Sequence, residues 1–221
     1  MQMKHHPDII DLSWSISVST PTYPTDPILT IKEPSDNLSG FYLRELSTAM
    51  HVGTHMDSQR HINQDGWDIS QIPLSQTIGL ASTIVINPVN GIILTKDIDE
   101  AYHQLFQKHP KLLIHTGYSS KRFDSDYFEQ VYSFEPSILD FLLHNQIELL
   151  GLDMPTFVYV GNNAAQAHHD LLDNRILIIE NLIHLDRLEP ECFFMSQPLK
   201  LDGFDGSMIR AVAINQWKMF Y

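Results

Sequence analysis

Three times in its second half the sequence repeats one pattern, a helical stretch followed by a short, almost wholly apolar run. The helical stretches cover residues 96–108, 136–145 and 164–173, and the apolar runs cover residues 112–114, 147–150 and 176–179. Apolar runs without polar alternation are typical of strands that are covered on both faces. Helices alternating with such strands predict an α/β fold.

The first half predicts a series of short strands separated by turn-forming residues. These strands are expected over residues 8–16, 28–32, 40–50, 82–87 and 91–94. Together the two halves predict a mixed β-sheet core with helices packed on it. Because 221 residues fall in the usual size range of one domain, we expect residues 1–221 to form a single domain.

The charge balance argues against several classes of partner. The chain carries 27 acidic and 14 basic residues, a net charge of −13 with neutral histidine. Such a field repels nucleic acid and anionic lipid. The one cysteine, Cys192, cannot form an internal disulfide and suggests a reducing compartment. The amino-terminal residues lack an apolar leader segment, and no apolar run reaches the roughly 18 residues of a membrane span, so we expect a cytoplasmic protein without a membrane partner.

The segment HVGTHMDSQRH, residues 51–61, places three histidines and one aspartate within eleven residues. Imidazole and carboxylate are common ligands of first-row metal ions. In a straight strand His51 and Asp57 would lie about 20 Å apart, too far for one ion. We therefore expect the chain to bend at Gly53, which would turn His51, His55 and Asp57 inward. A helix carrying His51 and His55 one turn apart is the less favoured alternative, because it places glycine and threonine inside that turn.

A second group of candidate ligands lies further along the chain. The helical stretch ending near Asn174 presents His168 or His169, and Glu180 directly follows an apolar run. A carboxylate in that position is expected to be partly buried and therefore to need a cation. That cation is either a metal ion shared with the first cluster or an arginine, Arg175 or Arg187.

The segment HVGTHMDSQRH resembles the signature H-x-G-T-H-x-D-x-P-x-H of the cyclase-like metal-dependent hydrolase family, which includes kynurenine formamidases and isatin hydrolases. Further landmarks follow in family order across most of the chain: Asp11-Leu12-Ser13, Pro21-Thr22-Tyr23-Pro24, residues 113–118, Gly151-Leu152-Asp153, and His168 with Glu180. The resemblance implies a single-domain swivelling β/β/α-type fold.

The resemblance also implies a set of site residues. His51, His55 and Asp57 would bind one metal ion, Asp57 and Glu180 would bridge to a second ion, and His168 would complete the second site. The family spacing of twelve residues to the glutamate selects His168 over His169. His61 matches the catalytic proton carrier, and Tyr23 occupies a substrate-contact position. One or two divalent ions are implied, with Zn²⁺ or Mn²⁺ the first choice among ions that suit this donor set, which also suits Fe²⁺.

Three residues depart from the family pattern: Gln59 replaces the motif proline, Thr25 replaces a glycine, and Val158 stands where many members carry an acid. None is a proposed ligand. They affect the expected pocket shape, and loss of the proline is expected to relax the loop that aims His61.

We therefore predict a metal-dependent hydrolase of an amide-type bond, either an N-formyl aryl amide or a cyclic lactam, acting on a small molecule. Two alternatives are a metal-assisted cyclase or dehydratase and a catalytically silent metal-dependent binding module. Trp14, Tyr23, Phe41 and Trp67 could line an aryl pocket, although core packing is the expected role of all but Tyr23. The resemblance further implies a homodimer or homotetramer.

Overall fold

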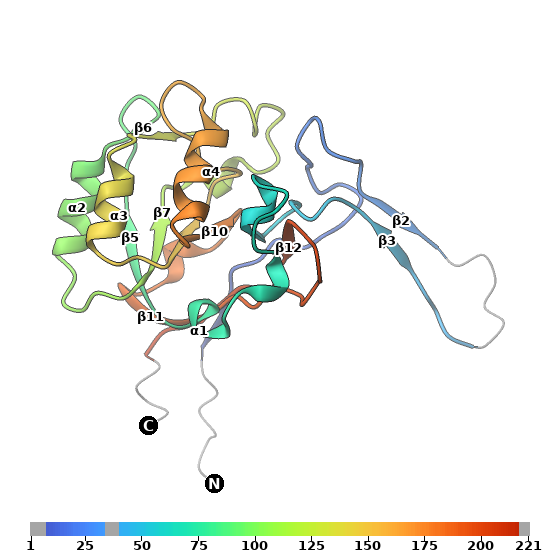
Figure 1. Cartoon of the computed structure of the whole chain (residues 1–221). Coiled ribbons are helices and arrows are strands. Elements are labelled where there is room, and N and C mark those ends of the chain that lie inside the picture. The colour runs from blue at the N-terminus through green and yellow to red at the C-terminus, as the bar shows by residue number, and fades with distance from the viewer. Residues whose placement is uncertain (1–7, 34–39, 217–221) are drawn as a thin grey trace, which may run out of the picture.

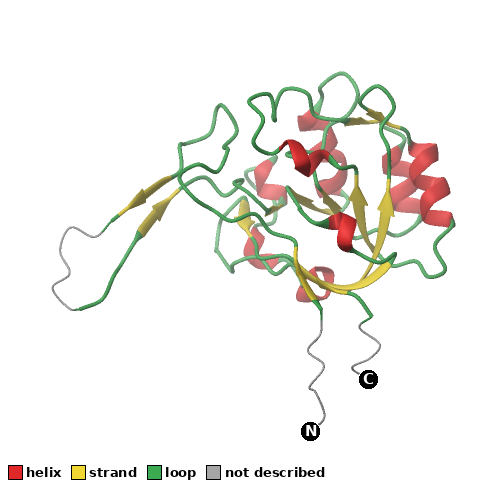
Figure 2. Ribbon diagram, turned by 180° about the vertical axis from the view of Figure 1, so that it is seen from behind, coloured by secondary structure: helices red, strands yellow, loops and turns green. Residues whose placement is uncertain are grey.

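The computed structural model of the chain describes residues 8–33 and 40–216. The amino-terminal residues 1–7, where we expect no leader segment, lie outside this range. Nine strands form one curled mixed sheet in the order β1-β13-β11-β5-β7-β9-β10-β4-β12. This architecture confirms the predicted mixed α/β fold (Figures 1 and 2).

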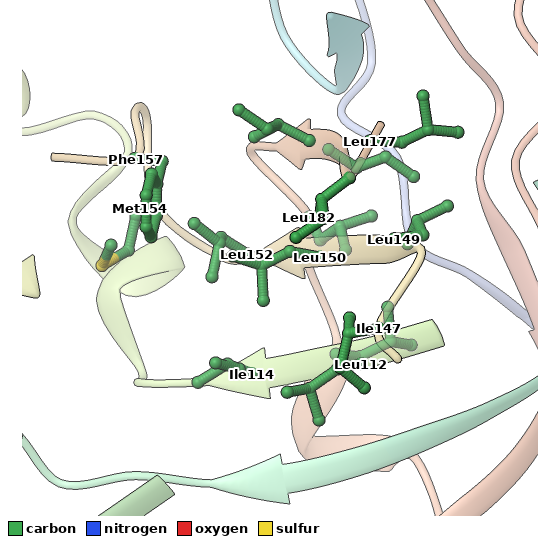
Figure 3. Packing of buried hydrophobic residues seen from close by; sticks show 14 of the residues in the cluster. Leu112, Ile114, Ile147, Leu149, Leu150, Leu152, Met154, Phe157, Leu177 and Leu182 are labelled. Carbon is green, nitrogen blue, oxygen red and sulfur yellow. The ribbon is translucent and has the colours of Figure 1, made fainter. Parts of the chain in front are cut away.

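The centre of the sheet is parallel and contains the apolar runs found in the sequence. It consists of β5 (Ile78–Val85), β7 (Lys111–His115), β9 (Leu149–Leu152) and β10 (Leu177–Glu180). Side chains on these strands, including Leu112, Ile114, Leu150 and Leu177, pack into the buried core shown in Figure 3. The prediction that these strands are covered on both faces is therefore confirmed.

Three helices of the repeated pattern lie beside these strands: α2 (Thr95–His103), α3 (Ile138–His144) and α4 (Ala164–Asp173) (Figure 1). A fourth, short helix, α1 (Leu74–Thr77), precedes β5. The side chain of Asn163 caps α4 by accepting a hydrogen bond from the Gln166 amide at 3.1 Å. This cap fixes the start of the helix that carries His168.

Antiparallel strands complete both sides of the sheet. On one side lie β11 (Glu191–Met195), β13 (Val212–Ile214) and β1 (Ile9–Asp11), and on the other lie β4 (His55–Asp57) and β12 (Gly206–Met208). Pairing of β4 with β10 sets His55 opposite Glu180, and pairing with β12 sets Asp57 opposite Gly206. The sheet thereby brings together residues that are far apart in the sequence.

Two small sheets stand apart from the main one, β6 (Ile92–Ile93) with β8 (Ser133–Phe134), and β2 (Thr30–Lys32) with β3 (Glu45–Ser47). The β2–β3 pair projects from the body of the protein in both views (Figures 1 and 2). We call residues 28–33 and 40–47 the arm. Residues 8–33 and 40–216 also contain four short 3₁₀ turns: Gln59–His61, Ile69–Gln71, Tyr118–Lys121 and Leu185–Arg187. Across the described part of the chain, no helix has the length and apolar character of a membrane span.

Candidate metal centre

The segment from His51 to Asp57 folds back on itself at Gly53. Gly53 has a positive φ of 60°, which favours glycine, and a Cβ atom there would lie 2.5 Å from Cδ1 of Ile16 and would displace the end of that side chain. Residues 48–54 form an irregular connection between β3 and β4 rather than the bent continuous strand that we predicted. The predicted consequence is nevertheless present, since His51 Nδ1 lies 2.9 Å from Asp57 Oδ1.

Two hydrogen bonds of the Thr54 side chain hold this turn against the sheet. Its hydroxyl donates a hydrogen bond to the carbonyl of Asn181 at 2.7 Å and accepts one from the Trp14 amide at 3.0 Å. Because Asn181 directly follows Glu180, the turn that carries His51 is held against the end of β10. The two groups of candidate ligands predicted from separate parts of the sequence are therefore adjacent.

Helix α4 and strand β10 supply the second group. His168 Nε2 lies 3.2 Å from Glu180 Oε1 and 3.5 Å from Asp57 Oδ2, while Glu180 Oε2 lies 3.3 Å from His55 Nε2. His168 and Glu180 are 5% and 4% exposed, whereas His169 lies at the helix surface beside Asp173. The structure thus brings together all five predicted ligands, with His168 rather than His169 turned inward.

Glu180 does not pair with either arginine that we considered from the sequence. Within the described residues its carboxylate is contacted by His55, His168 and the Phe157 amide, which donates at 2.8 Å. The guanidinium of Arg175 instead lies over the ring of Trp67, 5.2 Å from its centroid.

Backbone carbonyls orient two of the imidazoles. His55 Nδ1 lies 2.9 Å from the Gly53 carbonyl and His168 Nδ1 lies 2.8 Å from the Ala164 carbonyl. A carbonyl only accepts, so both Nδ1 atoms carry hydrogen and both Nε2 atoms face the carboxylates. Hydrogen bonding of one ring nitrogen while the other faces a shared centre is the usual arrangement of metal-binding histidines.

The donor atoms fit a divalent ion. One set, from His51, Asp57 and His61, and another, from His55, Asp57 and Glu180, each hold ligand atoms within 4.8 Å of one another. Asp57 belongs to both sets, and its buried Oδ2 atom has no hydrogen-bond partner within the described structure. A buried carboxylate oxygen without a donor is costly unless a cation contacts it.

The carboxylates of the cluster favour the protonated form of the imidazoles beside them. Burial opposes the His51 imidazolium, but the Asp205 and Asp57 carboxylates outweigh it and raise the pKa of His51 to about 10. Burial likewise opposes the His168 imidazolium, yet Asp57 and Glu180 raise its pKa well above the usual value. Burial acts to raise the pKa of Asp57, but the neighbouring His168 and His51 imidazoles lower it well below the usual value. The carboxylates of the cluster therefore favour a positive charge at its centre.

His61, the predicted proton carrier, lies on the rim of this cluster with its side chain 36% exposed. Its ring centroid is 3.9 Å from that of His51 and 5.7 Å from that of His168. Unlike the five candidate ligands, it combines proximity to the cluster with access to solvent.

Sequence reasoning missed Asp205. Its Oδ2 atom lies 3.0 Å from His51 Nε2 and 3.9 Å from His61 Nδ1. The hydrogen bond with His51 is the main cause that lowers the pKa of Asp205. In the sequence, Asp205 is an aspartate that precedes a glycine, a combination typical of turns. The pairing of β12 with β4 places it at the site.

A cavity of about 610 Å³ opens onto the cluster. His51, His55, His61, His168, Glu180 and Asp205 line its polar end, and Tyr23, Thr25 and Val158 also line it. The Tyr23 ring meets Phe128 edge-on with centroids 5.6 Å apart. Trp14 and Trp67 lie in the core, as predicted, whereas Phe41 is exposed on the arm.

Gln59, which replaces the motif proline, forms hydrogen bonds that connect the loop carrying His61 to Asp173 and Trp67. Its side-chain amide donates to Asp173 Oδ1 on α4 at 2.6 Å and accepts from the Trp67 amide at 3.3 Å. The relaxation that we predicted from loss of proline is therefore opposed by hydrogen bonds that proline could not form.

Comparison with known proteins places this chain in a family. Residues 10–157 match the Cyclase family model, described as "Putative cyclase". Kynurenine formamidase of Salinibacter ruber is 27% identical, with 92% of this chain and 96% of that protein covered. Isatin hydrolase A of Labrenzia aggregata superposes with a TM-score of 0.80 at 20% identity, covering 94% and 93% of the two chains. A structure described as a potential metal-dependent hydrolase with cyclase activity superposes at 0.79 and 22% identity, covering 96% and 99%. The chain belongs to the Cyclase family.

Proposed function

We propose that this protein is a metal-dependent hydrolase of an amide-type bond in a small molecule, an N-formyl aryl amide or a cyclic lactam. The observation that carries the proposal is Asp57, a buried carboxylate that belongs to both donor sets and has one oxygen without a hydrogen-bond partner. The relatives support the chemistry, because kynurenine formamidase and isatin hydrolase are both named for hydrolysis of such compounds.

In this proposal His51, His55 and Asp57 hold one divalent ion, and Asp57, His168 and Glu180 hold a second, as the family resemblance implies. His61, whose ring also belongs to one of the two donor sets, is assigned to proton transfer instead. Oxygen and nitrogen donors without thiolate favour Zn²⁺ or Mn²⁺. When bound, such an ion lowers the pKa of water to about 7 and polarises a carbonyl group.

The protein's own groups then complete the reaction. Hydrolysis adds a water oxygen to the carbonyl carbon, breaks the C–N bond and requires a proton on the departing nitrogen. His61 is placed to hold that proton because it lines the cavity beside the ligand cluster and remains partly exposed. An imidazole suits this role near neutral pH, and Tyr23 at the aromatic wall would orient the substrate ring.

The experiment is product analysis with aryl formamides and lactams in ¹⁸O-labelled water, using the metal-loaded protein. Hydrolysis predicts one labelled oxygen in the released acid. Product without label would indicate a cyclase or dehydratase, and metal and ligand binding without turnover would indicate a binding module. Either result would reject the proposal.

His61→Ala tests the proton carrier. Because a positioned acid or base contributes about 10² to 10⁴ in rate, kcat should fall by at least about 10² while the metal content stays unchanged. His169→Ala, a surface histidine on α4, is the control and should retain activity.

Assembly and location are further parts of the proposal. The arm exposes Ile28, Phe41, Tyr42 and Leu43 by 70–89%, and such a patch supports self-association into a homodimer or homotetramer. The single cysteine, Cys192, is buried and free, which is compatible with a reducing cytoplasm. We also propose a single domain over residues 1–221, a proposal supported by the continuous nine-stranded sheet of the described residues.

A further inference from the structure

The side chains of fixed charge that line the cavity are all acidic. Among the described residues that line it, the side chains of fixed charge are four carboxylates, Asp26, Glu129, Glu180 and Asp205, and neither lysine nor arginine is present. Arg60 lines a neighbouring hollow that shares His61, Ile62 and Asp205 with the cavity.

The four carboxylates fall into two groups. Glu180 and Asp205 contact the imidazoles of the ligand cluster, where a bound divalent ion would offset their charge. Asp26 and Glu129 lie close in the chain to the aromatic pair: the Asp26 amide donates to the Tyr23 carbonyl at 2.9 Å, and Glu129 follows Phe128. Neither belongs to the candidate ligand sets, so an ion held by those sets would leave two further carboxylates lining the cavity.

Among the described residues, the remaining walls contain no lysine or arginine. Their apolar residues include Pro21, Pro27, Ile62, Val131, Pro155 and Val158, and their polar residues, Thr25, Thr156, Asn162 and Asn181, are uncharged. A carboxylate or phosphate that bound against these walls would lose water without gaining a cationic partner. A flat uncharged ring would instead bury apolar surface against Tyr23 and Phe128, and an ammonium group on that ring would be attracted by Asp26 and Glu129.

We propose that the cavity accepts aryl amides whose ring is uncharged or carries a positive group, and discriminates against those whose ring carries a carboxylate or phosphate. The inference rests on the proposed hydrolase function and narrows its substrate class.

Three formanilides that differ only in the para substituent test the inference: 4-methyl, 4-aminomethyl and 4-carboxymethyl. The methylene group separates the charge from the ring electronically, so the scissile bond is nearly the same in all three. Because a cleft of one charge changes substrate capture by about 10- to 10³-fold, kcat/KM for the aminomethyl compound should exceed that for the carboxymethyl compound at least about tenfold at low salt. The ratio should shrink as the ionic strength rises.

Glu129→Lys should raise kcat/KM for the carboxymethyl compound and lower it for the aminomethyl compound. Glu100→Lys, an exposed site on α2 outside the cavity lining, makes the same change in net charge and is the matched control. If Glu100→Lys shifts the ratio as much as Glu129→Lys, the preference comes from the net charge of the molecule and the inference is wrong.

Equal or better turnover of the carboxymethyl compound by the unmodified protein would also overturn the inference. Failure of the hydrolase function is distinguishable, because then none of the three compounds is hydrolysed. In that case calorimetric binding of the three compounds to the metal-loaded protein decides: tighter binding of the aminomethyl compound supports the charge preference, and equal or absent binding rejects it.

Discussion

At the scale of single residues, His51 connects the cluster to the one carboxylate that sequence analysis missed. It lies between Asp57 and Asp205, at 2.9 Å and 3.0 Å. These two charges stabilise a proton on His51, and a metal ion that His51 binds would have to replace this proton.

The raised pKa of His51 predicts how the stability of the metal-free protein depends on pH. Its pKa rises from 6.5 to about 10 on folding, so its contribution is fully present below pH 6.5 and is lost as pH rises towards 10. The free energy of unfolding measured with urea in the presence of a chelator should therefore fall over that range. Asp205→Asn removes one partner of His51 and should reduce this fall, whereas an identical fall in both proteins would contradict the interpretation.

The residues of the site could be predicted to an uneven extent. His51, His55, Asp57, His168 and Glu180 were predicted together because imidazoles and carboxylates cluster in the sequence and match a family signature. Asp205 was not, because its role depends on the register between β12 and β4, in which Gly206 faces Asp57. Register between strands that are distant in the sequence leaves no local signal.

At the scale of elements, the turn at Gly53 determines whether the ligands converge. Gly53→Ala should destabilise the protein by about 1–2 kcal/mol through the strain of positive φ, and by a smaller further amount because the added Cβ atom would displace the end of the Ile16 side chain. Gly117→Ala is the matched control, since Gly117 has a φ of 78° but no atom within 4 Å of a Cβ atom. Thermal or urea unfolding measures both variants. Equal losses would show that contact with Ile16 is unimportant.

The loop that carries His61 depends on Gln59. Gln59→Ala removes the hydrogen bonds to Asp173 and Trp67 and should lower kcat several-fold through poorer positioning of His61, with little change in KM or metal content. Gln166→Ala removes a similar amide–carboxylate bond, to Asp170 on the same helix, and should leave kcat unchanged. A fall in kcat shared by both variants would mean that α4 as a whole, rather than the loop, is disturbed.

The elements themselves were predicted well where the local pattern was strong. Residues 164–173 form α4 as expected, and the apolar runs form the central strands. Residues 8–16 were expected to form one strand, but β1 ends at Asp11 because the chain then bonds to other partners, including Ser13 to Ala211 and Trp14 to Thr54. These contacts come from distant segments, so propensity could not reveal them.

At the scale of the whole molecule, the arm is notable because its large apolar side chains remain largely exposed in the single chain. Phe41, Tyr42 and Leu43 are 71%, 89% and 70% exposed. If the arm mediates assembly, replacing all three with serine should convert the oligomer to a monomer, as measured by light scattering or sedimentation. Phe106→Ser, at a residue 97% exposed outside the arm, should leave the mass unchanged. An unmodified protein that is already monomeric would contradict the proposed assembly.

The arrangement of the whole sheet was predictable only in outline. Helix–strand alternation predicted its parallel centre. The antiparallel strands on its two sides were not predictable, because they join segments that are far apart in the sequence. These strands are β11, β13 and β1 on one side and β4 and β12 on the other. The site exists because two of these strands, β4 and β12, bring Asp57 and Asp205 to the end of β10.

Metal content of the purified protein tests this assembly most directly. After incubation with Zn²⁺ or Mn²⁺ and extensive dialysis, elemental analysis should find one or two ions per chain in the unmodified protein and in Asp99→Asn, which alters an exposed carboxylate on α2. Asp57→Asn, if its circular dichroism shows it folded, should retain fewer ions because it alters the carboxylate common to both donor sets. An unmodified protein that retains no ion, or a folded Asp57→Asn that retains as many, would contradict the central claim.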